Sequence, residues 1–153
     1  MSFFDAISIA ASGLTAERTR MDVTSENLAN ADTTQGANGQ PYQRQEVVLQ
    51  QVGGGFSAAL SGAMGTLPGT SSTTGSAAGG VQVAGIVNDP TPDQSVYDPG
   101  NPSANAQGYV KMPNVNPVNE MVDMIDESRS YESDVTAMTT AKTMYEKTLD
   151  LLK

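Results

Sequence analysis

The residues that usually perform catalysis or bind metals are scarce in this chain. It contains neither histidine nor cysteine, which removes the commonest general base, thiol nucleophiles, disulfides and thiolate metal ligands. Serine and threonine are abundant, but no histidine can activate them and no nucleophile-elbow motif surrounds them. We therefore expect no catalytic residues, no cofactor and no enzymatic activity.

Carboxylates are the one remaining group that could do chemistry. Four of them lie close together, namely Glu120, Asp123, Asp126 and Glu127. Carboxylates can bind a cation, but these fall at the start of a predicted helix and lack the loop of an EF-hand. We interpret them as a solvated helix face and predict no metal site.

Charge and hydropathy limit the possible partners. The chain has 153 residues, with 8 Lys+Arg against 17 Asp+Glu, so its net charge is -9. Such a chain repels phosphate backbones and anionic membranes, so we expect no nucleic-acid partner. No apolar run approaches the about 18 residues that span a bilayer. The N-terminus also lacks the basic segment of a cleaved secretory signal.

The first element that could position partner-binding residues is a predicted helix over residues 1–30. Six of eight positions at alternating steps of three and four are apolar. This average spacing of about 3.5 residues is typical of a coiled-coil seam. The apolar positions are Phe4, Ile7, Ala11, Leu14, Met21 and Leu28.

A second, longer helix is predicted over residues 117–153. Asn116 is a good N-cap, and Pro117 suits the first helical position, where its missing N–H is not needed. Eight of ten positions on its seam are apolar. They are Met121, Met124, Tyr131, Val135, Met138, Tyr145, Leu149 and Leu152.

The segment between the helices reads as short strands separated by turns. Candidate strands lie at 46–49, 81–87, 96–97 and 109–110. We predict a mainly α fold, in which the terminal helices pack as a coiled coil beside a small β-rich subdomain. The organisation has three parts: a helix and motif at 1–34, a β-rich middle at 35–116, and a helix at 117–153.

Residues 53–80 are rich in glycine, serine, alanine and threonine and contain no charge. This composition predicts a flexible loop. The helical spacing of Phe56, Leu60, Met64 and Leu67 leaves open a short docking helix that forms on assembly, although the glycines between them oppose it.

The two predicted helices differ in length, so pairing within one chain leaves part of the longer seam uncovered. Aromatic residues are only 5% of the chain, which predicts a small internal core. Apolar seams that are exposed at both ends of a chain indicate association with partners.

The most specific motif lies at the end of the first helix. It is the string Ser25-Glu26-Asn27-Leu28-Ala29-Asn30-Ala31-Asp32-Thr33. This string resembles the signature of bacterial flagellar rod and hook proteins. We expect the amides of Asn27 and Asn30 to bind backbone groups where the helix ends, while Leu28 and Ala29 continue the apolar seam.

Further strings extend the resemblance over nearly the whole chain except 53–80. They include Gly39-Gln40-Pro41-Tyr42, Val96-Tyr97-Asp98-Pro99-Gly100-Asn101-Pro102, Gly108-Tyr109-Val110, Pro113-Asn114-Val115-Asn116 and Ser128-Arg129-Ser130-Tyr131-Glu132. Within the rod and hook family, the chain is similar to the short subunits of the proximal rod.

The resemblance implies a structural role in the flagellar basal body. Family members are exported unfolded by the flagellar type III apparatus, without cleavage. In the periplasm they polymerise helically with copies of themselves and with other rod subunits. Their terminal helices line the tube that transmits torque and serves as the export channel.

Two other readings remain open at this stage. One is a different axial subunit of the rod or hook, although those proteins are generally longer. The other is a soluble coiled-coil adaptor or export chaperone, which would form a stable small oligomer by itself.

Overall fold

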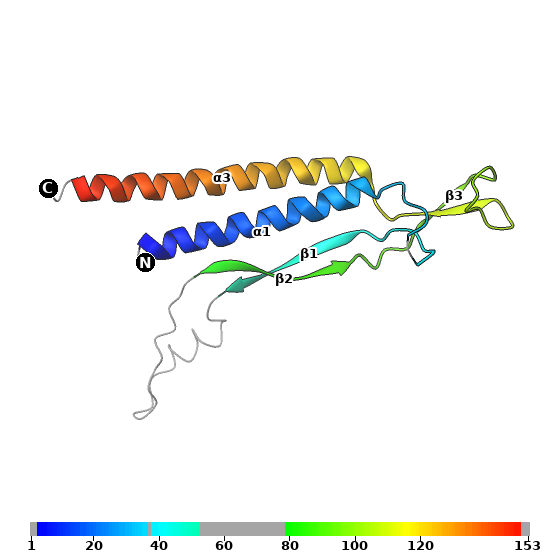
Figure 1. The fold of residues 1–153 in the computed structure, drawn as a ribbon, viewed down its shortest axis with the longest axis horizontal. Coiled ribbons are helices and arrows are strands. Elements are labelled where there is room, and N and C mark those ends of the chain that lie inside the picture. The colour runs from blue at the N-terminus through cyan, green and yellow to red at the C-terminus, as the bar shows by residue number, and fades with distance from the viewer. Residues whose placement is uncertain (1–2, 37, 53–78, 151–153) are drawn as a thin grey trace, which may run out of the picture.

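A computed structural model describes residues 3–36, 38–52 and 79–150. In chain order the elements are α1 (Phe3–Ala29), β1 (Gln45–Val52), β2 (Gly80–Asn88), β3 (Gln94–Tyr97), β4 (Tyr109–Met112) and α3 (Pro117–Asp150). The two helices lie side by side, and the β1–β2 hairpin runs along α1 (Figure 1). The predicted fold class is confirmed: two long terminal helices pack together, with small antiparallel sheets between them in sequence.

The loop predicted over 53–80 falls outside the described residues except for its last two positions. The docking helix left open over 56–67 lies wholly outside them. The side chain of Phe4 and all of Leu152 also lie outside the described part of the chain.

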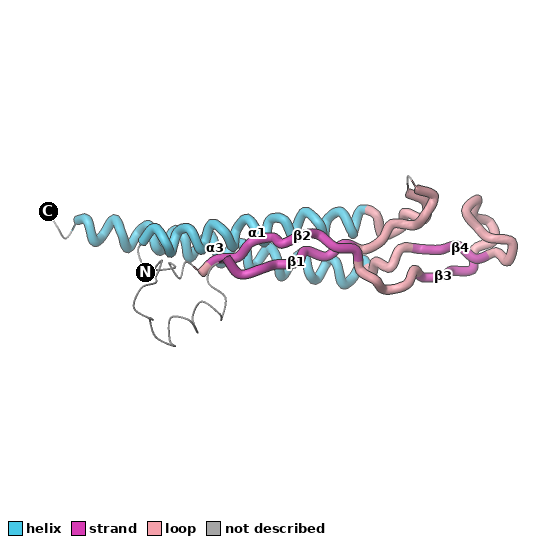
Figure 2. Tube along the Cα trace, turned by 90° about the horizontal axis from the view of Figure 1, so that it is seen from below, coloured by secondary structure: helices cyan, strands magenta, loops and turns pink. Residues whose placement is uncertain are grey.

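The helices α1 and α3 run antiparallel, so the end of α1 meets the start of α3. Contacts between them recur at steps of seven residues along each helix: Asn27 with Glu120, Arg20 with Glu127, and Gly13 with Asp134. A step of seven is the repeat of a coiled coil. With 34 residues against 27, α3 extends beyond the N-terminal end of α1 (Figures 1 and 2).

A glycine allows a close approach at one of these contacts. A β-carbon at Gly13 would lie 2.6 Å from Oδ2 of Asp134. The carboxylate of Asp134 therefore approaches the α1 backbone at a position where any side chain would displace it.

Two separate two-stranded sheets form the middle of the chain. β1 pairs antiparallel with β2 from Gln45↔Asn88 to Val52↔Gly80, with a bulge at Ala84. β3 pairs antiparallel with β4 and lies beyond the end of the helix pair (Figure 2). All four predicted strands exist, and each extends beyond its predicted core.

The start of α3 follows the capping chemistry predicted from the sequence. The helix begins at Pro117. Oδ1 of Asn116 accepts a hydrogen bond from the Val118 N–H at 3.0 Å, as an N-cap side chain does. The Glu120 N–H donates to the Asn116 carbonyl at 3.1 Å, which closes the first turn.

The hydrophobic core of the described residues is small. The buried apolar residues are Ala16, Val23, Ala31, Val110 and Val115. Larger apolar side chains are exposed on α3 and on all four strands. Neither described helix is both long and apolar enough to cross a bilayer. This distribution of apolar surface fits a subunit that completes its packing against other proteins.

Candidate functional site

Segments that are far apart in sequence meet in a polar cluster where α1 ends and α3 begins. We call this cluster the joint. Its residues are Asn27, Tyr42, Arg44, Asp89, Asn114 and Glu120. They come from α1, from the segment before β1, from the segment after β2, from the segment between β4 and α3, and from α3 itself.

Asn27 makes four hydrogen bonds through its side-chain amide, and only 1% of it is exposed. Its Oδ1 accepts hydrogen bonds from the Gln45 N–H and the Tyr42 hydroxyl, both at 2.9 Å. Its Nδ2 donates to the Gln45 carbonyl at 2.9 Å and to Oε2 of Glu120 at 3.1 Å. Because an asparagine amide has two donor and two acceptor positions, every one of them is used.

Tyr42 keeps the proton that this network needs. Burial, followed by the negative charges of Glu26 and Glu120, raises the pKa of Tyr42 to about 12. The hydroxyl is therefore a hydrogen-bond donor to Asn27 throughout the physiological pH range.

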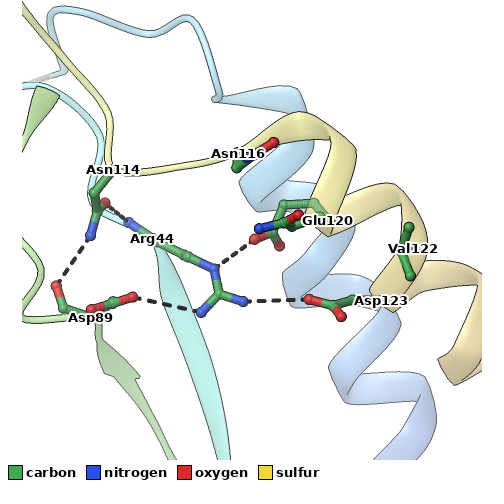
Figure 3. Close-up of a pocket in the computed structure, with 8 residues that line it drawn as sticks. Arg44, Asp89, Asn114, Asn116, Glu120, Val122 and Asp123 are labelled. Carbon is green, nitrogen blue, oxygen red and sulfur yellow. Dashed lines mark hydrogen bonds and ion pairs between the residues drawn. The ribbon is translucent and has the colours of Figure 1, made fainter.

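Arg44 supplies the positive charge of the joint (Figure 3). Its Nε donates to Oε1 of Glu120 at 2.6 Å, and its Nη1 bonds Glu46. Nη1 also lies 3.7 Å from Oδ2 of Asp89, and Nη2 lies 3.6 Å from Oδ2 of Asp123. Glu120 is only 1% exposed, so its carboxylate depends on Arg44 and Asn27 for its partners.

Asn114 lies in the segment between β4 and α3 and connects it to the segments before β1 and after β2. Its Oδ1 accepts from the Arg44 N–H at 2.8 Å, and its Nδ2 donates to the Thr91 carbonyl at 3.1 Å. Hydrogen bonds from the Thr91 hydroxyl and N–H lower the pKa of Asp89, which stays ionised beside Arg44. The joint thus fixes α1, α3 and the β1–β2 hairpin relative to one another.

The two asparagines of the signature motif have different roles. Nδ2 of Asn30 donates to the Glu26 carbonyl at 2.9 Å, so the prediction that it binds backbone where the helix ends is confirmed. The Asn27 amide also binds backbone groups, but these are the N–H and carbonyl of Gln45 at the start of β1 and not those of its own helix end, and it binds the Glu120 side chain as well. The reason is its place on the helix: Asn27 lies on the face covered by both neighbours.

The other motif residues are less buried. Thr33 donates its hydroxyl proton to Oδ1 of Asn30 at 3.2 Å. Leu28 is half-buried, while Ser25 and Ala29 are exposed. The motif therefore places one buried amide, that of Asn27, and one amide that binds the end of the helix, that of Asn30.

The prediction of a solvated carboxylate face at the start of α3 is wrong for two of its four residues. Glu120 and Glu127 are buried, at 1% and 6% exposure, because they face α1. Asp123 and Asp126 are exposed, as predicted. Within the described residues, no group of three or more His, Cys, Asp or Glu side chains is placed to hold a metal ion.

Glu127 is an imperfectly paired carboxylate between the helices. Its Oε1 accepts from the Thr24 hydroxyl at 3.1 Å and lies 3.7 Å from Nε of Arg20. Its Oε2 is buried and has no hydrogen-bond partner within the described part of the chain. Burial raises the pKa of Glu127, and the partial relief from Thr24 and Arg20 does not cancel this effect.

We expect the Glu127→Gln variant to be more stable than the parent at pH 7, by on the order of 1 kcal/mol. An acid whose pKa is higher in the folded state binds protons more tightly there, so parent stability falls as pH rises above the usual value of 4.5. Glutamine has no charge to bury and removes this loss. Thermal unfolding of both proteins between pH 4 and pH 8 tests this expectation. The stability of the variant relative to the parent should increase with pH. A difference that is constant or reversed contradicts the expectation.

Two polar cavities flank the contact between Arg44 and Asp123. One, of about 400 Å³, is lined by Arg44, Asp89, Asn114, Asn116, Asn119, Glu120, Val122 and Asp123. The other, of about 270 Å³, is lined by Arg20, Val23, Thr24, Asn27, Arg44, Gln45, Glu46, Val47, Asp123 and Glu127.

On α3, the predicted seam residues divide into two groups. Met124, Tyr131 and Met138 are half-buried toward α1, whereas Met121, Val135, Tyr145 and Leu149 are exposed. The predicted α1 positions Ile7, Leu14, Met21 and Leu28 are all half-buried. The most buried α1 residues are Ala16, Val23, Thr24 and Asn27. They lie off the predicted stripe because α1 contacts α3 and the β1–β2 hairpin on two sides.

The face of α3 opposite α1 carries a cluster of exposed apolar side chains. We call it the outer patch; its members are Val118 (63% exposed), Met121 (47%), Val122 (51%) and Ile125 (55%). Their spacing puts them on one helical face, roughly opposite the row that contains Glu120 and Glu127. The sequence-based stripe included only Met121 among them.

Sequence reasoning missed the charged members of the joint. No sequence pattern gave Arg44 a role, and Glu120 was assigned to a solvated face. A signal was present: Glu120, Glu127 and Asp134 repeat every seven residues on a helix whose apolar seam has the same period. Their partners, however, are distant in sequence: Asn27 lies 93 residues before Glu120, and Thr24 lies 103 residues before Glu127. No local sequence pattern reveals such pairs.

Comparison with known proteins matches both ends of the chain and its full length. Residues 7–38 match the family described as flagella basal body rod protein, and residues 106–151 match the C-terminal family of flagellar basal body rod FlgEFG proteins. The chain is 46% identical over 157 aligned residues to the flagellar basal-body rod protein FlgC of Bacillus subtilis, with all of both chains covered.

Two further relatives carry the same name. The chain is 42% identical to FlgC of Escherichia coli O6:H1, with 99% of this chain and 98% of the relative covered. It is 38% identical to FlgC of Borreliella burgdorferi, with 100% and 99% covered. On this evidence the chain belongs to the FlgC family of flagellar basal-body rod proteins, a family of structural, non-enzymatic rod subunits.

Proposed function

We propose that this rod subunit assembles with other rod subunits and with copies of itself through its terminal helices, in the proximal part of the rod. The observation that carries the proposal is the outer patch, a group of four large apolar side chains about half exposed on the face of α3 that α1 does not cover. A soluble monomer gains nothing from such a cluster, whereas a subunit buries it on assembly.

The end of α3 supports the same proposal. Towards the end of α3, the row that faces α1 continues with Tyr145 and Leu149, which are 40% and 45% exposed, and α3 extends past the N-terminal end of α1 (Figure 1). The helix therefore offers apolar surface to neighbours at both ends: its outer face near the start and its inner face near the end. The three-part organisation at 1–34, 35–116 and 117–153 would separate this assembly unit from the β-rich middle.

The energy available from the outer patch is sufficient for one contact in a polymer. Burying the exposed halves of four such side chains contributes about 1 kcal/mol each, or about 4 kcal/mol in total. That is modest for an isolated pair of molecules, which must also lose rotational and translational freedom. Repeated contacts in a helical array make the same surface effective.

We further propose that the chain reaches the periplasmic rod through the flagellar type III export apparatus, without a cleaved signal peptide. The small core of the described residues supports this, because a fold with few buried apolar residues has a small free energy of unfolding to overcome before export. The absence of cysteine removes disulfides that could trap a folded form.

The test of assembly replaces the outer patch without touching the inner face of α3. We expect the variant with Val118, Val122 and Ile125 all changed to glutamine to be exported and folded but not incorporated into rods. Glutamine is a good helix former, so α3 should be retained. The measurement is the amount of this subunit in basal bodies purified from cells in which the variant replaces the parent, together with swimming motility.

The matched control changes exposed polar positions on the same helix, Ser130→Gln with Ser133→Gln. These residues lie off the outer patch, so this variant should assemble like the parent. Normal incorporation of the patch variant into rods would overturn the proposal that the outer patch is an assembly surface.

A further inference from the structure

The two cavities of the joint carry more negative charge than the chain itself neutralises. Together their lining includes five carboxylates, Glu46, Asp89, Glu120, Asp123 and Glu127, against two guanidinium groups, Arg20 and Arg44. The formal excess is three negative charges. Arg44 is shared by four of these carboxylates, so none of the four has a cation of its own.

A buried acceptor in the smaller of the two cavities has no partner among the described residues. The Glu127 side chain is only 7% exposed and lines the smaller cavity, and its Oε2 accepts no hydrogen bond from any described residue. An unmatched buried carboxylate oxygen is costly unless a donor reaches it. The chemistry that fits is a cationic hydrogen-bond donor.

The outer patch adjoins this charge. Val122 belongs to the patch and also lines the larger cavity, directly beside Asp123 in sequence. Figure 3 shows Val122 and Asp123 on the same stretch of α3, with the Asp123 carboxylate directed to Arg44. A ligand that covers Val122 therefore has the larger cavity, with its carboxylates Asp89, Glu120 and Asp123, within reach of a long side chain.

We infer that the joint receives a lysine or arginine side chain from a neighbouring protein subunit whose apolar residues cover the outer patch. This inference rests on the proposed assembly through α3 and identifies the chemistry of the partner. Charge-assisted hydrogen bonds to the rim carboxylate of Asp123 would fix the register of the neighbour, while the apolar contacts supply most of the affinity.

A second copy of this chain is a poorer occupant than a different, more basic subunit. The net charge of each copy is -9, so two copies repel. The lysines of the exposed end of α3, Lys142 and Lys147, share that end with Glu146 and Asp150, and Lys142 already lies 3.9 Å from Glu146. That segment is neutral overall and offers no excess of positive charge.

The direct test places a photo-reactive amino acid at Val122 in the full chain and cross-links it within assembled rods in cells. The cross-linked peptide is then identified by mass spectrometry. We expect a peptide from a different rod subunit, with a lysine or arginine within four residues of the cross-linked position and apolar residues beside it. A peptide without a cation nearby, or a peptide from another copy of this chain, overturns the inference.

Charge reversal supplies the second measurement. We expect Asp123→Lys to reduce the amount of this subunit in rods at least tenfold, and replacement of the partner's cation by glutamate to restore it. The matched control is Asp126→Lys, which makes the same charge change on the same helix at a side chain that is 70% exposed and that, among the described residues, pairs with Arg129 at 4.0 Å. Equal effects of the two variants, or no rescue, would refute the inference.

The outcomes separate this inference from the proposed function. If the glutamine variant of the outer patch fails to assemble while Asp123→Lys assembles normally, assembly through α3 stands and the cationic partner is wrong. If both assemble normally, both are wrong. Circular dichroism of each purified variant establishes that α3 is folded, so that a loss of rods is attributed to the interface.

Discussion

Replacing Asn27 by alanine is expected to lower the free energy of unfolding by about 3 kcal/mol or more, because several buried groups lose their partners at once. The Tyr42 hydroxyl, the N–H and carbonyl of Gln45, and Oε2 of Glu120 all bond the Asn27 amide. Alanine can replace none of these bonds, and the space is too buried for water to compensate freely. Urea titration followed by circular dichroism measures the change.

The neighbouring asparagine of the same motif is the natural control. Asn30→Ala removes one bond to the Glu26 carbonyl and one from Thr33, both near the end of α1 where water has access. We expect a loss of about 1 kcal/mol or less. Equal losses for the two variants would show that Asn27 acts only as a local helix residue and that the joint does not stabilise the subunit.

The helices could be predicted from sequence because their signals are local. Asn116 and Pro117 mark the start of α3 through capping chemistry that needs only neighbouring residues. The apolar period of the two ends indicated that they would pair, and α1 and α3 do pair. The four short strands were recognisable from turn residues and β-branched side chains, although their lengths were underestimated.

The face of α3 that meets α1 could not be predicted from hydrophobicity. The inner row alternates between apolar Met124 and Tyr131 and acidic Glu120, Glu127 and Asp134. A search for apolar residues at a period of 3.5 misses the acidic members of this row. It selects instead the exposed apolar residues that directly follow two of them, Met121 after Glu120 and Val135 after Asp134. The acidic positions are tolerated because their partners come from other elements: Arg44 reaches Glu120 across 76 residues of sequence.

The polar contacts between α1 and α3 explain how the two helices can be ordered with few buried apolar residues between them. Hydrogen bonds with fixed geometry set the register of α1 against α3, while few large apolar side chains are used between them. The larger apolar side chains of this part of α3 lie instead in the outer patch, where we propose that other subunits bury them. A joint that holds the helices in register also holds the outer patch in a constant position, which a repeating assembly requires.

The ion pair between Arg44 and Glu120 should show strong coupling. We expect Arg44→Met to cost about 3 kcal/mol, because it leaves the buried Glu120 carboxylate with a single donor, Asn27. Glu120→Gln should cost less, about 1 to 2 kcal/mol, since it removes the charge while keeping an amide that can still form hydrogen bonds. The double variant should be more stable than the sum of the two losses implies, by about 2 kcal/mol.

Arg129→Met is the matched control for this cycle, since within the described part of the chain Arg129 pairs with Asp126, at 4.0 Å between two exposed side chains. Its cost should stay within about 0.5 kcal/mol. Urea unfolding of the four proteins of the cycle and of the control gives all these values in one experiment. A coupling energy near zero would mean that the buried Glu120 carboxylate does not depend on Arg44. The register of α1 against α3 would then have to come from the apolar contacts of Met124, Tyr131 and Met138 and not from the joint.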